Sequence, residues 1–236
     1  MTIENVGKSA EERIRAIQEY TGYPSDLRVL PVRQGELSCL YLSSLSNAQA
    51  VEKAFCFFDR FGKQVFTVGN GQERNPQHYT DLKKAAEKLL EGIILFLNNS
   101  TGIYSLEVQG WVRRKPKEPE TERLIRGPRE GFTETLEDNI GMVRRWIRDP
   151  DLKVEEVRVG RRTKTRVTLM YLSDIAQPGL VKEVRRRIQA IGIDGLLEAG
   201  YIEQLITDRR ASIFPLIQST ERSDRVAAAI FRNFSG

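Results

Sequence analysis

A break in composition near the middle of the 236-residue chain most constrains its fold. Residues 113–120 read RRKPKEPE, so two prolines and six charged side chains fill the whole stretch. Such a stretch is typical of a boundary or linker, because proline interrupts regular secondary structure and charges favour solvent. We therefore expect two subdomains, at residues 1–112 and 126–236, joined by a linker at residues 113–125.

Helices and strands are predicted to alternate in the first subdomain. Helices are expected after the capping boxes Ser9-Ala-Glu-Glu12 and Ser46-Asn-Ala-Gln49, and from a cap at Thr80 to Gly92. The strand-like runs are residues 27–32, 37–42, 64–68, 93–97 and 103–108, with a polar loop at 69–79. This alternation indicates an α/β domain.

An amphipathic helix is the clearest element of the second subdomain. Its apolar positions recur at spacings of four, four, three and four, and they are Phe132, Leu136, Ile140, Val143 and Ile147. Acidic residues occupy its first turns, and Arg144, Arg145 and Arg148 its last, which complements the helix macrodipole. Asp149-Pro150 is expected to end it.

Further elements are predicted towards the C-terminus. They are a hairpin at 154–159 and 165–172, a helix from Pro178 with Leu180 facing inward, a helical turn at 196–199, a strand at 212–218, and a helix at 224–231. The predicted fold class is therefore α/β in the mixed, α+β sense, with two subdomains that each pack helices on a small mixed sheet.

The composition indicates a soluble chain without a disulfide framework. Cys39 and Cys56 stand in apolar surroundings, which favours two buried free thiols; one disulfide in a secreted protein is the alternative. The N-terminus shows no apolar signal sequence, and the longest apolar run, residues 93–97, is far too short to span a membrane.

The net charge of +5 is concentrated in one window. Residues 113–166 hold 16 Lys/Arg and 11 Asp/Glu, so this window alone carries +5. Positive charge attracts nucleic acid and anionic lipid, but interleaved acids and scarce aromatics favour a solvated, mixed-charge surface. We expect no specific nucleic-acid binding.

Residues for catalysis or for a metal or cofactor site are not evident. The single histidine, His78, stands in a polar loop, and no zinc, redox, serine-nucleophile or P-loop motif occurs. The stretch Arg126-Gly-Pro-Arg129 does not suit a phosphate, because proline removes a backbone N–H that an anion nest needs. The sequence predicts no enzyme, no cofactor and no metal.

The order of motifs after Gly110-Trp111 resembles the GerA family of spore germination proteins. The similarity runs from "ERLIRGPREGFTETLEDNIGMVRRW" through "SIFPLIQSTERSDRVAAAI". The candidate interface residues that this resemblance implies are Arg126, Gly127, Pro128, Arg129, Phe132, Asn139, Arg144, Gly160, Asp194, Phe214, Pro215, Glu221 and Arg222. The chain departs from the family pattern at Ser223, where the family usually has proline, and after Ile230.

The resemblance implies the soluble N-terminal domain of the A subunit of a nutrient germinant receptor. The full-length subunit would then lie in the spore inner membrane, anchored by a C-terminal domain that follows this chain, with the soluble domain on the core side. The implied partners are the B and C receptor subunits and further A subunits. The implied role is assembly and germination signalling without catalysis. The alternative is a sensor that binds a small nutrient, an amino acid or a sugar, between the subdomains.

Overall fold

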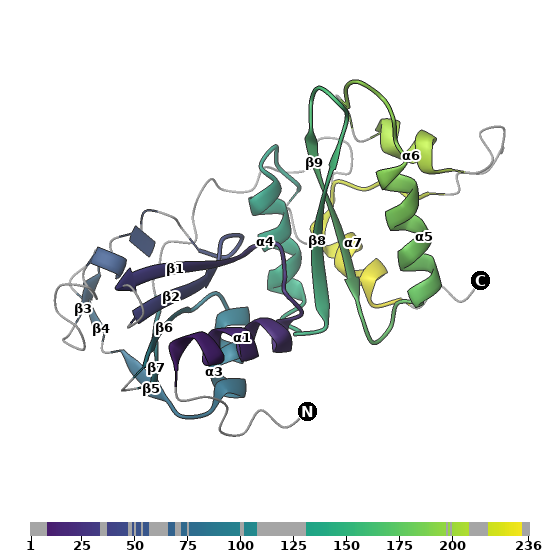
Figure 1. The fold of residues 1–236 in the computed structure, drawn as a ribbon. Coiled ribbons are helices and arrows are strands. Elements are labelled where there is room, and N and C mark those ends of the chain that lie inside the picture. Colours follow the sequence, from purple (N-terminus) through teal and green to yellow (C-terminus); the bar gives the residue numbers. More distant parts are fainter. Residues whose placement is uncertain are drawn as a thin grey trace, which may run out of the picture. The chain divides into compact units, whose positions relative to one another are not determined.

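The structure is a computed structural model that describes most of the chain (Figure 1). The described residues are 9–33, 37–46, 49, 51–52, 54–56, 66–68, 72–74, 76–99, 102–107, 131–196, 198, 200–207 and 217–232. The chain divides into two compact units. The first unit comprises Met1–Lys115 with Glu137–Pro150, and the second comprises Pro116–Leu136 with Asp151–Gly236. The predicted linker at 113–125 lies outside the described residues.

An antiparallel sheet of five strands forms the centre of the first unit. Its strands are β1 (Leu27–Arg33), β2 (Leu37–Leu42), β5 (Gln77–Tyr79), β6 (Ile94–Asn98) and β7 (Gly102–Leu106). They lie in the order β1-β2-β6-β7-β5. A separate antiparallel pair joins β3 (Phe66–Val68) to β4 (Gln72–Arg74). The segment predicted as a polar loop at 69–79 therefore contributes two short strands.

Both faces of the five-stranded sheet are covered, which explains the nearly continuous apolar sequence of β6. The helices α1 (Ala10–Thr21) and α3 (Leu82–Leu90) pack with one face, where Leu40 and Leu97 are buried. Cys39 and Phe96 are buried on the opposite face in a cluster that includes Val51. Alternation along each strand sends neighbouring side chains to opposite faces.

Local signals determine where the first helices begin. The capping box at Ser9 forms as predicted: its hydroxyl accepts a hydrogen bond from the Glu12 amide at 3.2 Å, while Glu12 accepts one from the Ser9 amide. Helix α3 is capped by Asp81 and not by Thr80, because the Asp81 carboxylate accepts hydrogen bonds from the Lys83 and Lys84 amides. A carboxylate also complements the positive N-terminal end of the helix dipole.

Helix α4 (Leu136–Trp146) is the predicted amphipathic helix, and Ile140 and Val143 on its apolar stripe are buried. Its residues from Glu137 onward belong to the first unit, which differs from the predicted assignment to a subdomain beginning at residue 126. Periodicity shows that a helix has an apolar face, but it does not show which sheet or loop that face meets.

A two-stranded antiparallel hairpin and three helices form the described part of the second unit. The hairpin pairs β8 (Leu152–Val159) with β9 (Thr165–Leu172), and the helices are α5 (Pro178–Gln189), α6 (Gly200–Ile206) and α7 (Ser223–Ile230). Val159, Ile188 and Leu196 form its buried cluster. The mixed α+β class is thus confirmed, with antiparallel pairing in every described sheet.

Several predicted details of the second unit differ from the structure. Leu180, predicted to face inward, is 53% exposed on α5. Of the helical turn predicted at 196–199, the described residues 196 and 198 are not helical, and α6 begins at Gly200. Most of the strand predicted at 212–218 lies outside the described residues.

The two cysteines are both free, as predicted, but only Cys39 is buried. Burial raises the pKa of the Cys39 thiol to about 12. Cys56 is exposed, contrary to the prediction from its apolar neighbours, because the helical residues around it present only one side to the core.

Candidate functional site

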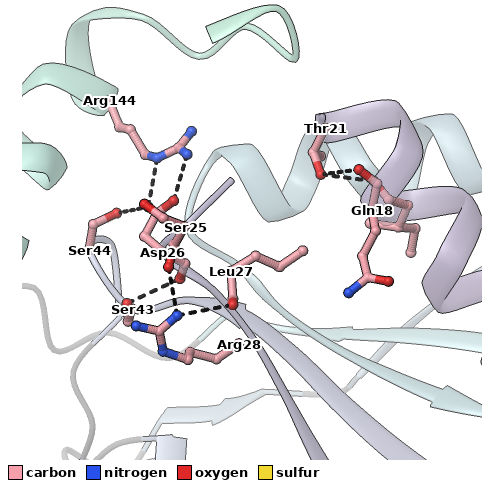
Figure 2. A network of polar contacts seen from close by, with 10 residues as sticks. Gln18, Thr21, Ser25, Asp26, Leu27, Arg28, Ser43, Ser44 and Arg144 are labelled. Carbon is pink, nitrogen blue, oxygen red and sulfur yellow. Dashed lines mark hydrogen bonds and ion pairs between the residues drawn. The ribbon is translucent and has the colours of Figure 1, made fainter. Parts of the chain in front are cut away.

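A buried ion pair joins Asp26 to Arg144 within the first unit (Figure 2). The Arg144 Nε donates to Asp26 Oδ2 at 2.8 Å, and Nη2 donates to Oδ1 at 2.7 Å. The two side chains are 3% and 2% exposed. The Ser44 hydroxyl donates a further hydrogen bond to Asp26 Oδ2. This bidentate geometry is the strong form of a guanidinium–carboxylate contact.

Strand register places Asp26 and Ser44 together at the open end of the β1–β2 hairpin. Leu27 pairs with Leu42, so Asp26 lies opposite Ser43. The Ser43 amide and hydroxyl both donate to the Asp26 carbonyl oxygen, at 2.8 and 3.1 Å. The hairpin end is therefore fixed by hydrogen bonds of its own, apart from its contact with α4.

Gly141 brings the α4 backbone against the same hairpin end. A Cβ atom at this position would overlap the Ser44 carbonyl oxygen. Gly141 and Arg144 are three positions apart, so they share one face of the helix. The absence of a side chain at 141 permits the close approach that lets Arg144 reach Asp26. The arrangement clamps α4 to the first unit; its charged groups are occupied by one another.

A second cluster of predicted residues forms at the turn of the β8–β9 hairpin. Gly160 has a φ of +90°, a conformation that favours glycine. The Arg162 amide donates to the Asp194 carbonyl oxygen at 2.8 Å, and the Asp194 carboxylate pairs with Arg161 at 3.0 Å. Gly160 and Asp194, both predicted from the family pattern, are thus brought together across the second unit's turn.

A third cluster joins the start of α7 to residues 131–132. The Phe132 amide donates to the Glu221 carbonyl oxygen at 2.7 Å, and Gly131 and Arg222 form an isolated antiparallel bridge. The Arg222 guanidinium pairs with Asp224 and lowers the pKa of that carboxyl. Phe132, Glu221 and Arg222 therefore meet within the second unit.

An ion-pair network that lowers the pKa of a carboxyl group lies beside α5. Glu155 on β8 accepts hydrogen bonds from Arg185 at 2.7 and 2.8 Å, and from the Tyr171 hydroxyl at 2.6 Å. The Arg185 guanidinium lowers the pKa of Glu155, and the Tyr171 hydroxyl also does so. Burial raises the pKa of Tyr171, with a further contribution from its carboxylate partner. These residues join β8, β9 and α5.

The structure describes some of the predicted candidate residues and not others. Arg126, Gly127, Pro128 and Arg129 lie outside the described residues, as do Phe214 and Pro215. Asn139 is half-buried on α4. Arg144 pairs with Asp26, which is not among the candidates. The interface role of these residues stays a prediction.

Sequence reasoning missed two residues of the buried cluster, Asp26 and Ser44. Neither stands in a recognisable motif, and 118 positions separate Asp26 from Arg144. The one available signal is an acidic residue directly before an apolar strand, in "PSDLRVL". That pattern is common at the surface and does not identify a buried partner.

Among the described residues, no helix has the length and apolar character to cross a membrane. Within the same residues, His, Cys, Asp and Glu side chains form no group of three or more suited to a metal ion.

Comparisons with known proteins relate this chain to spore germination proteins. The family model described as "Bacillus/Clostridium GerA spore germination protein" matches residues 18–232. Spore germination protein KA of Bacillus subtilis is 32% identical over 236 residues, covering 94% of this chain and 43% of that protein. Spore germination protein GerLA of Bacillus cereus is 43% identical over 138 residues, covering 58% of this chain and 28% of that protein.

A solved structure extends the relationship to the fold. The crystal structure of the N-terminal domain of the A subunit of the Bacillus megaterium spore germinant receptor GerK3 matches with a TM-score of 0.67 and 27% identity. The match covers 99% of this chain and 91% of that one. The chain spans less than half the length of the two curated relatives above. Because the family model matches nearly the whole chain, the chain belongs to the GerA family of spore germination proteins.

Proposed function

We propose that this chain is the N-terminal domain of a germinant receptor A subunit, acting in receptor assembly and germination signalling without catalysis. The observation that carries the proposal is the match to the N-terminal domain of the GerK3 A subunit over 99% of the chain. That domain belongs to the A subunit of a spore germinant receptor. The match includes both units.

The proposal extends to location and partners. The chain spans 43% of protein KA and matches an N-terminal domain, so we propose that the larger part of the full-length subunit follows it and holds it at the spore inner membrane, on the core side. The B and C subunits of the receptor and further A subunits would be its partners. The proposed role of the domain is to couple these partners to the membrane part of its own subunit.

The connectivity of α4 supports a signalling role. The chain leaves the second unit at Leu136, forms α4 in the first unit, and returns to the second unit at Asp151. Asp26 and Arg144 hold α4 in place by a buried bidentate pair. A force on α4 would therefore be transmitted along the chain at both ends of the helix, where the chain passes between the two units. This is a physical route by which a change in one unit could affect the other.

Deletion of the domain tests the proposal in the full-length protein. Spores would carry the tagged full-length subunit, the subunit without residues 1–236, or an Arg148→Met variant as a control, since Arg148 is exposed near the end of α4. We expect the deletion to abolish both co-purification of the B and C subunits and nutrient-triggered loss of refractility, and the control to preserve both. Normal co-purification and germination by the deletion strain would contradict the proposal.

Thermal melting separates assembly from germinant sensing. The purified 236-residue chain would be heated with and without amino acids and sugars. The proposal predicts an unchanged melting temperature. A nutrient at a hundredfold its dissociation constant would add about 2.7 kcal/mol of stability. A rise that saturates with nutrient concentration would reassign the domain as a sensor.

A further inference from the structure

Positive charge is concentrated at the end of the β8–β9 hairpin. Residues 158–166 read RVGRRTKTR, with five basic side chains and no acidic one. We call these five the basic hairpin end, and they are Arg158, Arg161, Arg162, Lys164 and Arg166. Among the residues that the structure describes, two acids pair with this end: Glu156 with Arg158 and Arg166, and Asp194 with Arg161 and Arg162. Five positive charges less two negative charges leave +3.

The turn that presents these charges is held firmly. The Arg161 amide donates to the Ile193 carbonyl oxygen at 3.0 Å, and Thr163 Oγ1 accepts from the Leu196 amide at 3.1 Å. Thr165 Oγ1 donates to the Leu196 carbonyl oxygen at 2.9 Å. Exposed turns often lack such support. These hydrogen bonds attach the turn to residues 193–196, so its side chains project from a fixed base.

The two guanidinium groups at the tip remain open to solvent. Arg161 is 73% exposed and Arg162 is 84% exposed. Within the described part of the chain, both pair with the single carboxylate of Asp194, at 3.0 and 3.8 Å. A guanidinium has five N–H donors, so one shared carboxylate leaves most of this capacity to a partner.

The charge arrangement at the hairpin end is unfavourable in isolation. Arg158 and Arg166 are direct cross-strand partners, and like charges at such positions destabilise a hairpin. Glu156 offsets part of this repulsion through its pairs with both. A binding partner that brings further negative charge would relieve the remainder.

We propose that the basic hairpin end docks an acidic segment of a partner protein. The inference rests on the proposed role in receptor assembly and specifies the chemistry of a partner. Exposed ion pairs are individually weak, so a lone anion would gain little, whereas several carboxylates on one chain act together. Residues 158–166 contain no aromatic side chain to stack on a nucleobase or to enter a lipid interface. A carboxylate-rich peptide suits the planar guanidinium groups.

A labelled hexaglutamate peptide serves as the probe, and hexaglutamine is its neutral control. Fluorescence anisotropy with the 236-residue chain would compare wild type with Arg161→Glu/Arg162→Glu. The matched control is Lys182→Glu/Arg186→Glu, which makes the same charge change on exposed positions of α5. Melting followed by circular dichroism would check that all variants fold.

We expect the tip variant to lose about tenfold or more in affinity and the α5 variant less than about twofold. Asp194→Asn should raise affinity, because it removes the acid that both arginines share while its backbone carbonyl remains. Equal losses in the two charge-reversed variants would overturn the proposal, as would equal binding of hexaglutamine or tighter binding to phosphatidylglycerol vesicles.

The outcome is separable from that of the proposed function. If the peptide fails to bind while deletion of residues 1–236 still abolishes co-purification of receptor subunits, the docking surface is wrong and the assembly role stands. If the peptide binds at the hairpin end while the deletion strain germinates normally, the docking surface stands and the assembly role is wrong.

Discussion

Breaking the buried pair between Asp26 and Arg144 should strongly destabilise the first unit. Replacing Arg144 by Met removes both guanidinium hydrogen bonds, at 2.8 and 2.7 Å, and leaves the 3% exposed Asp26 carboxylate without its counter-ion. Removing one member of a buried pair costs about 3–5 kcal/mol. Domains are stable by only about 5–15 kcal/mol, so this variant should lose a large share of its stability.

A double-mutant cycle distinguishes loss of the charge pair from loss of packing. Asp26→Asn alone strands the Arg144 charge and should cost a similar amount. The combination of both substitutions removes both buried charges, and the Ser44 hydroxyl retains an acceptor in the amide oxygen. We expect the double variant to be more stable than the sum of the single losses predicts by about 2 kcal/mol or more.

Urea denaturation followed by tryptophan fluorescence measures this loss of stability at α4. Trp146 ends α4, and Trp111→Phe leaves it as the only tryptophan of the chain. The exposed Arg148→Met serves as the control and should shift stability by less than about 0.5 kcal/mol. An Arg144→Met loss below about 1 kcal/mol, or strictly additive effects in the cycle, would refute the assignment of Arg144 as the clamp of α4.

Three further predictions concern other parts of the chain. Gly141→Ala should cost about 1–3 kcal/mol in urea denaturation, because the added methyl meets the Ser44 carbonyl oxygen; an unchanged midpoint would contradict that close approach. Ellman's reagent should titrate Cys56 alone in the folded chain and Cys39 only after unfolding, so two fast native thiols would disprove the burial of Cys39. The pKa of Glu155 is lowered from its ordinary 4.5, so its contribution to stability is complete above pH 4.5 and is lost as pH falls through the folded pKa. Glu155→Gln should flatten this part of the acid-denaturation profile, and an unchanged slope would count against the ion pair.

Short-range patterns predicted much of the secondary structure. The capping box at Ser9 and the apolar spacing through Ile140 each depend on residues within one or two helical turns, and both helices are present. Proline at position 178 likewise begins α5 as predicted. These signals depend on residues that are close in the sequence, so a single sequence is sufficient to predict the elements.

Long-range partners could not be predicted in the same way. The charge pattern predicts that Arg144 complements the C-terminus of its helix, which is a role for solvent-exposed arginine. The structure instead buries it against Asp26, 118 positions earlier. Leu180 shows the opposite error, because an apolar residue at a helical spacing was expected inside and lies 53% exposed. Burial depends on which surfaces meet, and periodicity does not contain that information.

Arginine has two different uses in this chain, and exposure decides which assay can detect each. Arg144 is 2% exposed, so its removal strands a desolvated charge and should appear as lost stability. Arg162 is 84% exposed and its ion pair is solvated, so its removal should leave the melting curve almost unchanged. A role for Arg162 is therefore to be sought in binding and not in the stability of the fold. A stability screen would find the clamp and miss the basic hairpin end, whereas a binding screen on folded variants would find the hairpin end. Agreement between those two screens would mean that one of the two burial assignments is wrong.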